Sequence, residues 1–257
     1  MNWHKATHFV SYLRNRKTRY DLHSPLVYNF VDQVIPNSSL DHPYKSIEKL
    51  RKQLLTNRTL IMVNDFGTGI KGQKKYQRSI SAIAKNSLKA SKYYRLLSES
   101  IKYFGTTSIL ELGTSLGIST LYMAQSGKQI HSIEGCENTA AIARENFKNF
   151  NANNVQSHIA PFDALLPGLL KQHQFNFIYI DGNHQYGATI NYTKEILKQI
   201  KQNCIIVYDD IYWSKGMTKA WEEIKGMNEI TVSIDFFEFG FAFINCDLSK
   251  ENFIIKY

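Results

Sequence analysis

The sequence S-I-L-E-L-G-T-S-L-G-I-S-T, residues 108–120, decides the fold. It begins as an apolar run interrupted by one acid, Glu111, breaks at Gly113 and Gly117, and continues as an apolar segment that suits a helix. This order of strand, glycine turn and helix is typical of parallel α/β sheets, which bind nucleotide-like ligands at such a turn. Glycine lets the backbone approach a ligand closely. We therefore expect a ligand site at this turn.

The chain beyond residue 105 alternates between short apolar runs and amphipathic segments. Besides 108–112, strands are expected at 129–134, 155–160, 175–180 and 204–208. Helices are expected between them, at 119–125, 138–149, 164–171, 188–200 and 215–225. Two further strands, 230–235 and 239–245, form a hairpin that places an antiparallel strand at the edge, and 252–256 is a candidate edge strand. This pattern predicts an α/β fold with a doubly wound, mostly parallel sheet of seven strands.

Residues 1–104 are expected to form a mainly helical extension, so we divide the chain into 1–104 and 105–257. Its helices are predicted at 25–35, where Pro36 ends the helix, and at 44–56, 80–88 and 91–103. The segment 60–63 is a short predicted strand. The glycines of 64–69 imitate the ligand turn, but the polar, basic residues 71–78 that follow indicate a loop or a lid.

Charge is divided unevenly along the chain. Residues 1–100 hold 18 lysines and arginines against 6 acids, whereas residues 101–257 hold 13 against 16. A basic front half suits nucleic acid, but no RNA-binding signature accompanies it, and a solvated helical surface is favoured. No apolar run approaches the ~20 residues that span a bilayer. Three scattered cysteines, Cys136, Cys204 and Cys246, are expected to be buried thiols in a reducing cytoplasm.

Acidic residues lie at or just beyond the end of every strand of the predicted parallel sheet: Glu111, Glu134, Asp163, Asp181 and the pair Asp209 and Asp210. The carboxyl ends of parallel strands meet at one edge of the sheet, where ligands bind. Clustered carboxylates repel a polyphosphate. They suit ribose hydroxyls, an adenine amino group and a cationic centre, which S-adenosylmethionine combines. A carboxylate at Glu134 can accept both ribose hydroxyls, although a surface acid is the alternative.

Four segments together resemble class I S-adenosylmethionine-dependent methyltransferases of Rossmann-like fold, in particular O-methyltransferases of the catechol and caffeoyl-CoA type. They are 109–119 (ILELGTSLGIS), 161–167 (PFDALLP), 180–186 (IDGNHQY) and 208–210 (YDD). The resemblance covers residues 105–245 and also implies a homodimer. The predicted cofactor-binding residues are Glu111, Gly113, Thr114, Ser115, Gly117, Ser119, Glu134, Gly135, Phe162, Asp163 and Asp181. Among them, Ser119 is expected to meet the methionine carboxylate.

In that family, an acid after the fourth strand and an Asp-Asn pair after the fifth hold Mg²⁺, which binds the acceptor oxygens. The resemblance implies Asp181, Asp209 and Asp210 as these ligands, although Asp210 stands where the family has Asn. His184 stands where the caffeoyl-CoA type has a lysine that helps deprotonate the acceptor. Histidine can act as a general base near neutral pH, so His184 and Asp181 are the catalytic candidates. Alternatively, Asp181 and Asp209 only line the cofactor pocket and His184 is a structural residue.

Methylation of a small-molecule hydroxyl is the favoured function. Two alternatives stay open: a methyltransferase that acts on RNA or protein through the basic N-terminal region, and a non-catalytic S-adenosylmethionine-binding module. The aromatic residues Tyr186, Tyr212 and Trp213 could form the wall of an acceptor site or pack in the core.

Overall fold

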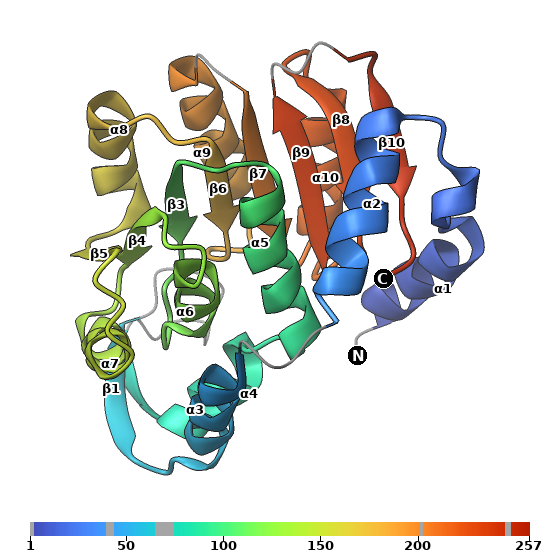
Figure 1. Ribbon diagram of the computed structural model, residues 1–257. Helices are drawn as coiled ribbons and strands as arrows, with labels where there is room; N and C mark the ends of the chain where they lie inside the picture. Colours follow the sequence, from blue (N-terminus) through green and yellow to red (C-terminus); the bar gives the residue numbers. More distant parts are fainter. Residues whose placement is uncertain (1–2, 40–43, 65–74, 201–202, 245–247) are drawn as a thin grey trace.

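The computed structural model describes residues 3–39, 44–64, 75–200, 203–244 and 248–257. Within them, one large sheet is flanked by helices on both faces (Figure 1). Its strands are β3 (Ser108–Leu112), β4 (Gln129–Glu134), β5 (Val155–Ile159), β6 (Phe177–Ile180), β7 (Cys204–Asp209), β8 (Ile230–Asp235), β9 (Phe239–Ile244) and β10 (Glu251–Ile254). They lie in the order β10-β8-β9-β7-β6-β3-β4-β5. The predicted doubly wound, mostly parallel sheet is confirmed, with β10 added to the seven expected strands.

The position of the antiparallel strand differs from the prediction. β9 runs antiparallel to β7 on one side and to β8 on the other, so it lies inside the sheet and not at its edge. Every residue of β9 (FGFAFI) is buried, and a strand without a polar face is stable only where helices cover both of its faces. The edge position falls instead to β10, which pairs in parallel with β8 and exposes Asn252.

The helices form two layers that cover the two faces of the sheet. One face packs against α2 (Pro25–Asn37), α5 (Ser91–Tyr103), α6 (Ile118–Ala124) and α7 (Glu137–Asn149), with α3 (Lys45–Thr56) and α4 (Ile80–Ser87) joined to them. The other face packs against α8 (Phe162–Gln172), α9 (Tyr186–Gln199) and α10 (Lys215–Gly226). No helix among the described residues combines the length and apolar character that crossing a bilayer requires.

The N-terminal helices share the core of the sheet. The ring of Phe30 on α2 lies 5.8 Å from that of Phe241 on β9, between centroids. Helix α1 (Trp3–Asn15) lies beside β10 and the C-terminus (Figure 1), where the Tyr12 hydroxyl donates to the Ile255 carbonyl at 2.6 Å. The boundary at residue 104 stays a prediction, but the described N-terminal helices are in direct contact with the sheet.

Two N-terminal elements correct the sequence interpretation. Helix α2 continues through Pro36 to Asn37, because a proline in the last turn removes only one N–H, while the N–H of Ser38 still bonds to the Val34 carbonyl at 2.9 Å. Residues 75–78, expected in a loop, belong to β2 (Lys75–Ser79), which pairs antiparallel with β1 (Leu60–Asn64). This strand alternates between exposed and half-buried residues without an apolar face, so its periodicity gave no signal. Residues 65–69 lie outside the described residues.

The remaining predicted helices and strands are confirmed, with ends that differ by at most two residues. Cys136 and Cys204 are buried, as expected, and Cys246 lies outside the described residues.

Candidate active site

A cleft of ≈ 500 Å³ opens at the carboxyl ends of β3, β4 and β6. This cleft, called here the cofactor cleft, lies at the glycine turn, where a ligand site is expected from the sequence. Its wall brings together seven of the predicted cofactor-binding residues: Gly113, Ser115, Glu134, Gly135, Phe162, Asp163 and Asp181. The other four, Glu111, Thr114, Gly117 and Ser119, do not line it.

Gly113 follows β3 and contacts the ends of both neighbouring strands, β4 and β6. Its φ is +111°, and a Cβ atom built on it would lie 2.0 Å from the backbone oxygen of Asp181. The N–H of Gly113 donates to the carbonyl of Ile133 at 2.9 Å. The N–H of Asp181 donates to the carbonyl of Leu112 at 2.8 Å. Since no side chain fits this space, the sequence needs glycine here for packing as well as for ligand approach.

Glu111 supports the turn from beneath. Its side chain is fully buried and accepts hydrogen bonds of 2.5 Å from the hydroxyls of Ser119, Thr120 and Ser132. Burial raises the pKa of Glu111, and these three donors oppose the rise. The Ser119 hydroxyl is therefore directed at Glu111, and its expected contact with a methionine carboxylate, like the direct ligand contact of Glu111, stays a prediction.

Thr114 and Gly117 also support the turn. The Thr114 hydroxyl hydrogen-bonds to that of Ser132 at 2.5 Å, and Gly117, at φ +81°, packs against the ring of Phe147. They shape the backbone of the turn, whereas Ser115 between them reaches the cleft wall.

Glu134 ends β4 with its carboxylate held by the backbone. One oxygen accepts the N–H of Ser115 at 2.8 Å and the other accepts the N–H of Cys136 at 2.9 Å. Burial raises the pKa of Glu134, and these amide hydrogen bonds oppose the rise. A carboxylate offers about four acceptor directions, so capacity remains for hydroxyl groups of a ligand in the cleft.

A second pocket of ≈ 430 Å³, called here the acceptor pocket, adjoins the cofactor cleft. The two share Ser115, Asp181, His184, Asp210 and Trp213 in their walls. Trp213 lines both pockets, and its part in an acceptor site stays a prediction. Tyr212 instead stacks on Phe237 and donates to Asp235, and Tyr186 donates to Glu223.

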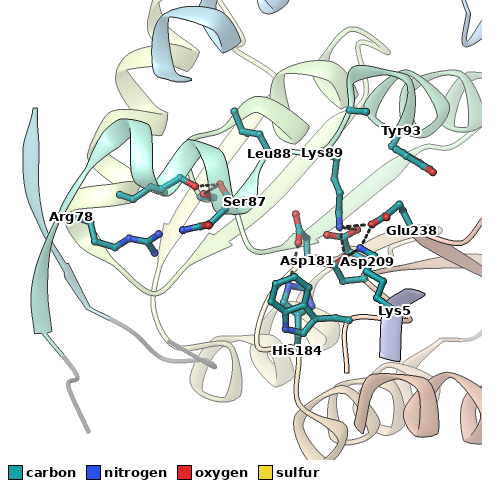
Figure 2. A pocket seen from close by; sticks show the side chains of 16 residues that line it. Lys5, Arg78, Ser87, Leu88, Lys89, Tyr93, Asp181, His184, Asp209 and Glu238 are labelled. Atoms are coloured by element: carbon teal, nitrogen blue, oxygen red, sulfur yellow. Dashed lines mark hydrogen bonds and ion pairs between the residues drawn. The ribbon is translucent and has the colours of Figure 1, made fainter. Parts of the chain in front are cut away.

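Five charged residues of the acceptor pocket form what we call the carboxylate–lysine cluster: Lys5, Lys89, Asp209, Asp210 and Glu238 (Figure 2). The Lys89 ammonium lies 3.0 Å from Glu238 Oε2 and 3.3 Å from Asp209 Oδ1, and it also donates to Asp210 Oδ1. The Lys5 ammonium lies 2.8 Å from Glu238 Oε2 and 3.3 Å from Asp210 Oδ1. The two lysines come from α1 and from the segment between α4 and α5.

The cluster is strongly coupled through its charges. Burial would lower the pKa of Lys89, but the three carboxylates raise it well above its usual range. Burial would raise the pKa of Asp210, but Lys89, His184 and Lys5 lower it to about 2. Both groups are therefore charged at neutral pH. Sequence reasoning missed Lys5, Lys89 and Glu238, since no motif marks them and their partners lie far away in the chain.

Asp181 and His184 lie beside this cluster, at the junction of the two pockets. His184 Nε2 is 3.6 Å from Asp181 Oδ1, and the Tyr179 hydroxyl donates to Asp181 Oδ2 at 3.1 Å. Burial and the neighbouring Asp209 raise the pKa of Asp181 well above its usual range. Possible ligand atoms of Asp181, His184 and Asp209 lie within 4.8 Å of one another.

The ligand set expected for Mg²⁺ consists of Asp181, Asp209 and Asp210, which all line the acceptor pocket, but the ligand atoms that converge are those of Asp181, Asp209 and His184. Asp210 has a φ of +53° and directs its carboxylate at the two lysines. The three residues that do converge offer an imidazole nitrogen in place of a third carboxylate, whereas Mg²⁺ prefers an octahedron of oxygens. With an ammonium group also bound to Asp209, these donors do not fit a resident Mg²⁺.

Residues 110–211, from β3 to just beyond β7, match the family model described as a methyltransferase domain. The match covers the cofactor cleft from the glycine turn to Asp209 and Asp210, and it confirms the resemblance found in the sequence. A search of curated protein sequences gave no significant match.

Solved structures share the fold of this chain. An O-methyltransferase from Bacillus cereus in complex with S-adenosylhomocysteine is 20% identical, with a TM-score of 0.53 over 62% of this chain and 82% of that one. A methyltransferase from Podospora anserina bound to S-adenosylhomocysteine is 19% identical, with a TM-score of 0.56 over 63% and 81%. An O-methyltransferase of tomaymycin synthesis from Streptomyces achromogenes, bound to S-adenosylmethionine, is 18% identical, with a TM-score of 0.52 over 61% and 80%. The Rossmann-like methyltransferase fold is thereby confirmed.

Proposed function

We propose that this chain is an S-adenosylmethionine-dependent methyltransferase (EC 2.1.1.-) that methylates a hydroxyl group of a small molecule. The observation that carries this proposal is the junction of the two pockets at Ser115, Asp181 and His184. A methyl donor in the cofactor cleft and an acceptor in the adjoining pocket would meet there, beside an imidazole that can take a proton.

The cofactor half of the proposal assigns one task to each part of the cleft. Glu134 accepts hydrogen bonds from the ribose hydroxyls, for which its two oxygens retain acceptor capacity. Phe162 and Asp163, at the start of α8, hold the adenine ring and its amino group. Gly113 and Ser115 hold the methionine end at the start of the glycine turn.

The chemical step needs alignment and removal of one proton. An oxygen lone pair of the acceptor forms the new O–CH₃ bond as the S–CH₃ bond breaks, and the bonding pair returns to sulfur to give neutral S-adenosylhomocysteine. His184 takes the hydroxyl proton, and its Nε2 lies 3.6 Å from Asp181 Oδ1, which positions the imidazole at the junction of the two pockets. Because the sulfonium supplies the driving force, the protein mainly positions its two substrates.

A small acceptor fits the size of the second pocket, ≈ 430 Å³. Two lysines of the basic front half, Lys5 and Lys89, are engaged inside this pocket and do not contribute to a nucleic-acid-binding surface. The cytoplasmic location expected from the sequence stays a prediction. The homodimer implied by the resemblance stays a prediction.

Calorimetric titration with S-adenosylhomocysteine tests the cofactor assignment. We expect the wild type to bind one equivalent, and Glu134→Ala to weaken binding by about 10- to 100-fold, since it removes charged acceptors of two hydroxyls. Glu137→Ala, which removes an exposed acid just beyond this site, is the matched control and leaves the affinity unchanged. The absence of binding by the wild type, or equal affinities for folded Glu134→Ala and wild type, contradicts the proposal.

A further inference from the structure

Lys89 is the most buried cation of the acceptor pocket, and it lies on the acids that were expected to hold a metal. We propose that Lys89 replaces the divalent cation of this site: its ammonium is the built-in counter-ion of Asp209, Asp210 and Glu238, and methyl transfer here requires no metal. This inference rests on the proposed function and deepens it, since it concerns how the same pocket handles charge.

The first argument is the pairing of the ammonium group with three carboxylates. Lys89 Nζ donates hydrogen bonds to Asp210 and, at 3.0 Å, to Glu238, and it forms an ion pair with Asp209 Oδ1 at 3.3 Å. The Lys89 side chain is only 11% exposed. Figure 2 shows it reaching down into the acids from above, with Lys5 on their other side. A buried cation paired with three carboxylates is a fixed part of the site.

The second argument is the way the backbone holds Lys89. Its N–H donates to the Tyr94 hydroxyl at 2.8 Å, and its carbonyl accepts from the Arg51 guanidinium at 3.0 Å. Tyr94 is fully buried on α5. The segment between α4 and α5 is thus anchored on both sides of this residue, and the side chain enters the pocket from a fixed point.

The third argument is that Lys89 and a divalent ion compete for the same oxygen. A Mg²⁺ ion lies about 2.1 Å from its oxygen ligands. An ion bound to Asp209 Oδ1 would therefore lie within about 5.4 Å of Lys89 Nζ, which is 3.3 Å from that oxygen. Like charges this close repel strongly in a buried site. Asp210 Oδ1 is already shared by the two lysines, so Lys89 and a divalent ion compete for the same carboxylates.

The consequence concerns the class of acceptor. A divalent ion selects acceptors with two neighbouring oxygens, because both can bind it. Without one, deprotonation depends on His184 and Asp181 alone, and a single hydroxyl group suffices. We infer an acceptor with one reacting hydroxyl, held against Trp213 and Tyr93, which line the same pocket.

Titration with MnCl₂ alone tests this inference without a methyl acceptor. Wild type, Lys89→Ala and Lys85→Ala are freed of metal with a chelator, saturated with S-adenosylhomocysteine, and titrated in a calorimeter. Lys85 is an exposed lysine four residues earlier, on α4, and serves as the matched control. We expect no binding by wild type or Lys85→Ala up to 1 mM Mn²⁺ (about the weak end of protein cation sites), and one Mn²⁺ bound by Lys89→Ala at least about tenfold more tightly. Asp209→Asn in the Lys89→Ala background should abolish that binding.

Thermal unfolding of the same samples provides a second measurement. Mn²⁺ should raise the Tm of Lys89→Ala and leave that of the wild type unchanged, because only a bound ligand stabilises the folded state. One Mn²⁺ bound by the wild type and lost in Asp209→Asn overturns the inference, and this result does not depend on whether Lys89→Ala folds. Folded Lys89→Ala that binds no Mn²⁺ overturns it as well. Failure of the proposed function is separate, since it appears as absence of S-adenosylhomocysteine binding before any metal is added.

Discussion

The two halves of the active site satisfy their acids in different ways. In the cofactor cleft, Glu111 and Glu134 accept hydrogen bonds from hydroxyls and backbone amides, all within 21 residues along the chain. In the acceptor pocket, Asp210 pairs with Lys89 and Lys5, which are 121 and 205 residues away. One half is built from neutral, local donors and the other from distant cations.

This difference decides what each half has left for a ligand. Neutral donors orient a carboxylate and leave its charge uncompensated, so the cofactor cleft keeps negative potential for a positively charged ligand such as a sulfonium. Lysines cancel the charge of the acids that they hold. The acceptor pocket is therefore close to neutral within itself, which suits an uncharged hydroxyl compound better than a metal complex.

The largest expected effect tests how closely the cofactor cleft is packed around Gly113. Gly113→Ala should destabilise the fold by more than about 3 kcal/mol and abolish S-adenosylhomocysteine binding, because its Cβ would overlap the Asp181 backbone oxygen at 2.0 Å. Gly127→Ala is the control: its φ is +71°, but nothing lies within 4 Å of the added Cβ, so about 1 kcal/mol is expected. Urea unfolding measures both. Equal losses would mean that backbone conformation and not close packing determines the need for glycine.

The second effect concerns the junction of the two halves. His184→Ala should reduce turnover by about 10²- to 10⁴-fold, the usual contribution of a general base, while S-adenosylhomocysteine affinity stays within about threefold. The measurement is release of S-adenosylhomocysteine from S-adenosylmethionine with a panel of hydroxyl compounds. A variant that loses cofactor affinity and turnover in equal proportion would assign His184 to the cofactor half.

The sequence predicted the residues of the cofactor cleft well and those of the acceptor pocket poorly. The strand ends at Glu134, Asp163 and Asp181 could be found because each acid follows an apolar run, and parallel strands bring such ends together. It could not show that Ser119 is directed at Glu111, since a hydroxyl at a helix start can also meet an anion.

Lys89 and Lys5 could not be predicted, because their role depends on the packing of α1 and of the segment between α4 and α5 over the sheet. A lysine in a basic region gives no sign of burial, and long-range ion pairs leave no periodic pattern. The same limit explains the internal position of β9, which depends on the order of strands in space and not on their order in the chain.

A third, smaller effect is the pH dependence of stability that Asp210 in the acceptor pocket confers. Asp210 has a pKa of about 2 in the folded protein, below its unfolded value of about 3.9, so its charge stabilises the fold above pH 4 and this stability is lost as the pH falls toward 2. The shift corresponds to about 2 kcal/mol. Asp210→Asn should therefore be less stable than wild type by about 2 kcal/mol at pH 7, and the difference should close near pH 2 to 3.

Urea unfolding at pH 7, 5 and 3 measures this difference, with Asp32→Asn as the control. Asp32 pairs with Arg19 at the surface, where both side chains are more than a third exposed, and an exposed pair contributes less than about 1 kcal/mol. A pH-independent difference for Asp210→Asn would mean that the lysines do not depend on its charge.

The smallest effect returns to the glycine turn. Ser119→Ala removes one of the three hydroxyls that hold Glu111, which should cost about 1 kcal/mol of stability and change S-adenosylhomocysteine affinity by less than about threefold. The pKa of Glu111 is raised by burial, so ionisation of this acid reduces stability as the pH rises, and loss of a donor increases that penalty. The destabilisation by Ser119→Ala should therefore be larger at pH 8 than at pH 5. The opposite pattern would be unchanged stability with an affinity reduced more than about tenfold. It would mean that the Ser119 hydroxyl binds the cofactor, so that this residue of the glycine turn is a ligand contact and not only a support for Glu111.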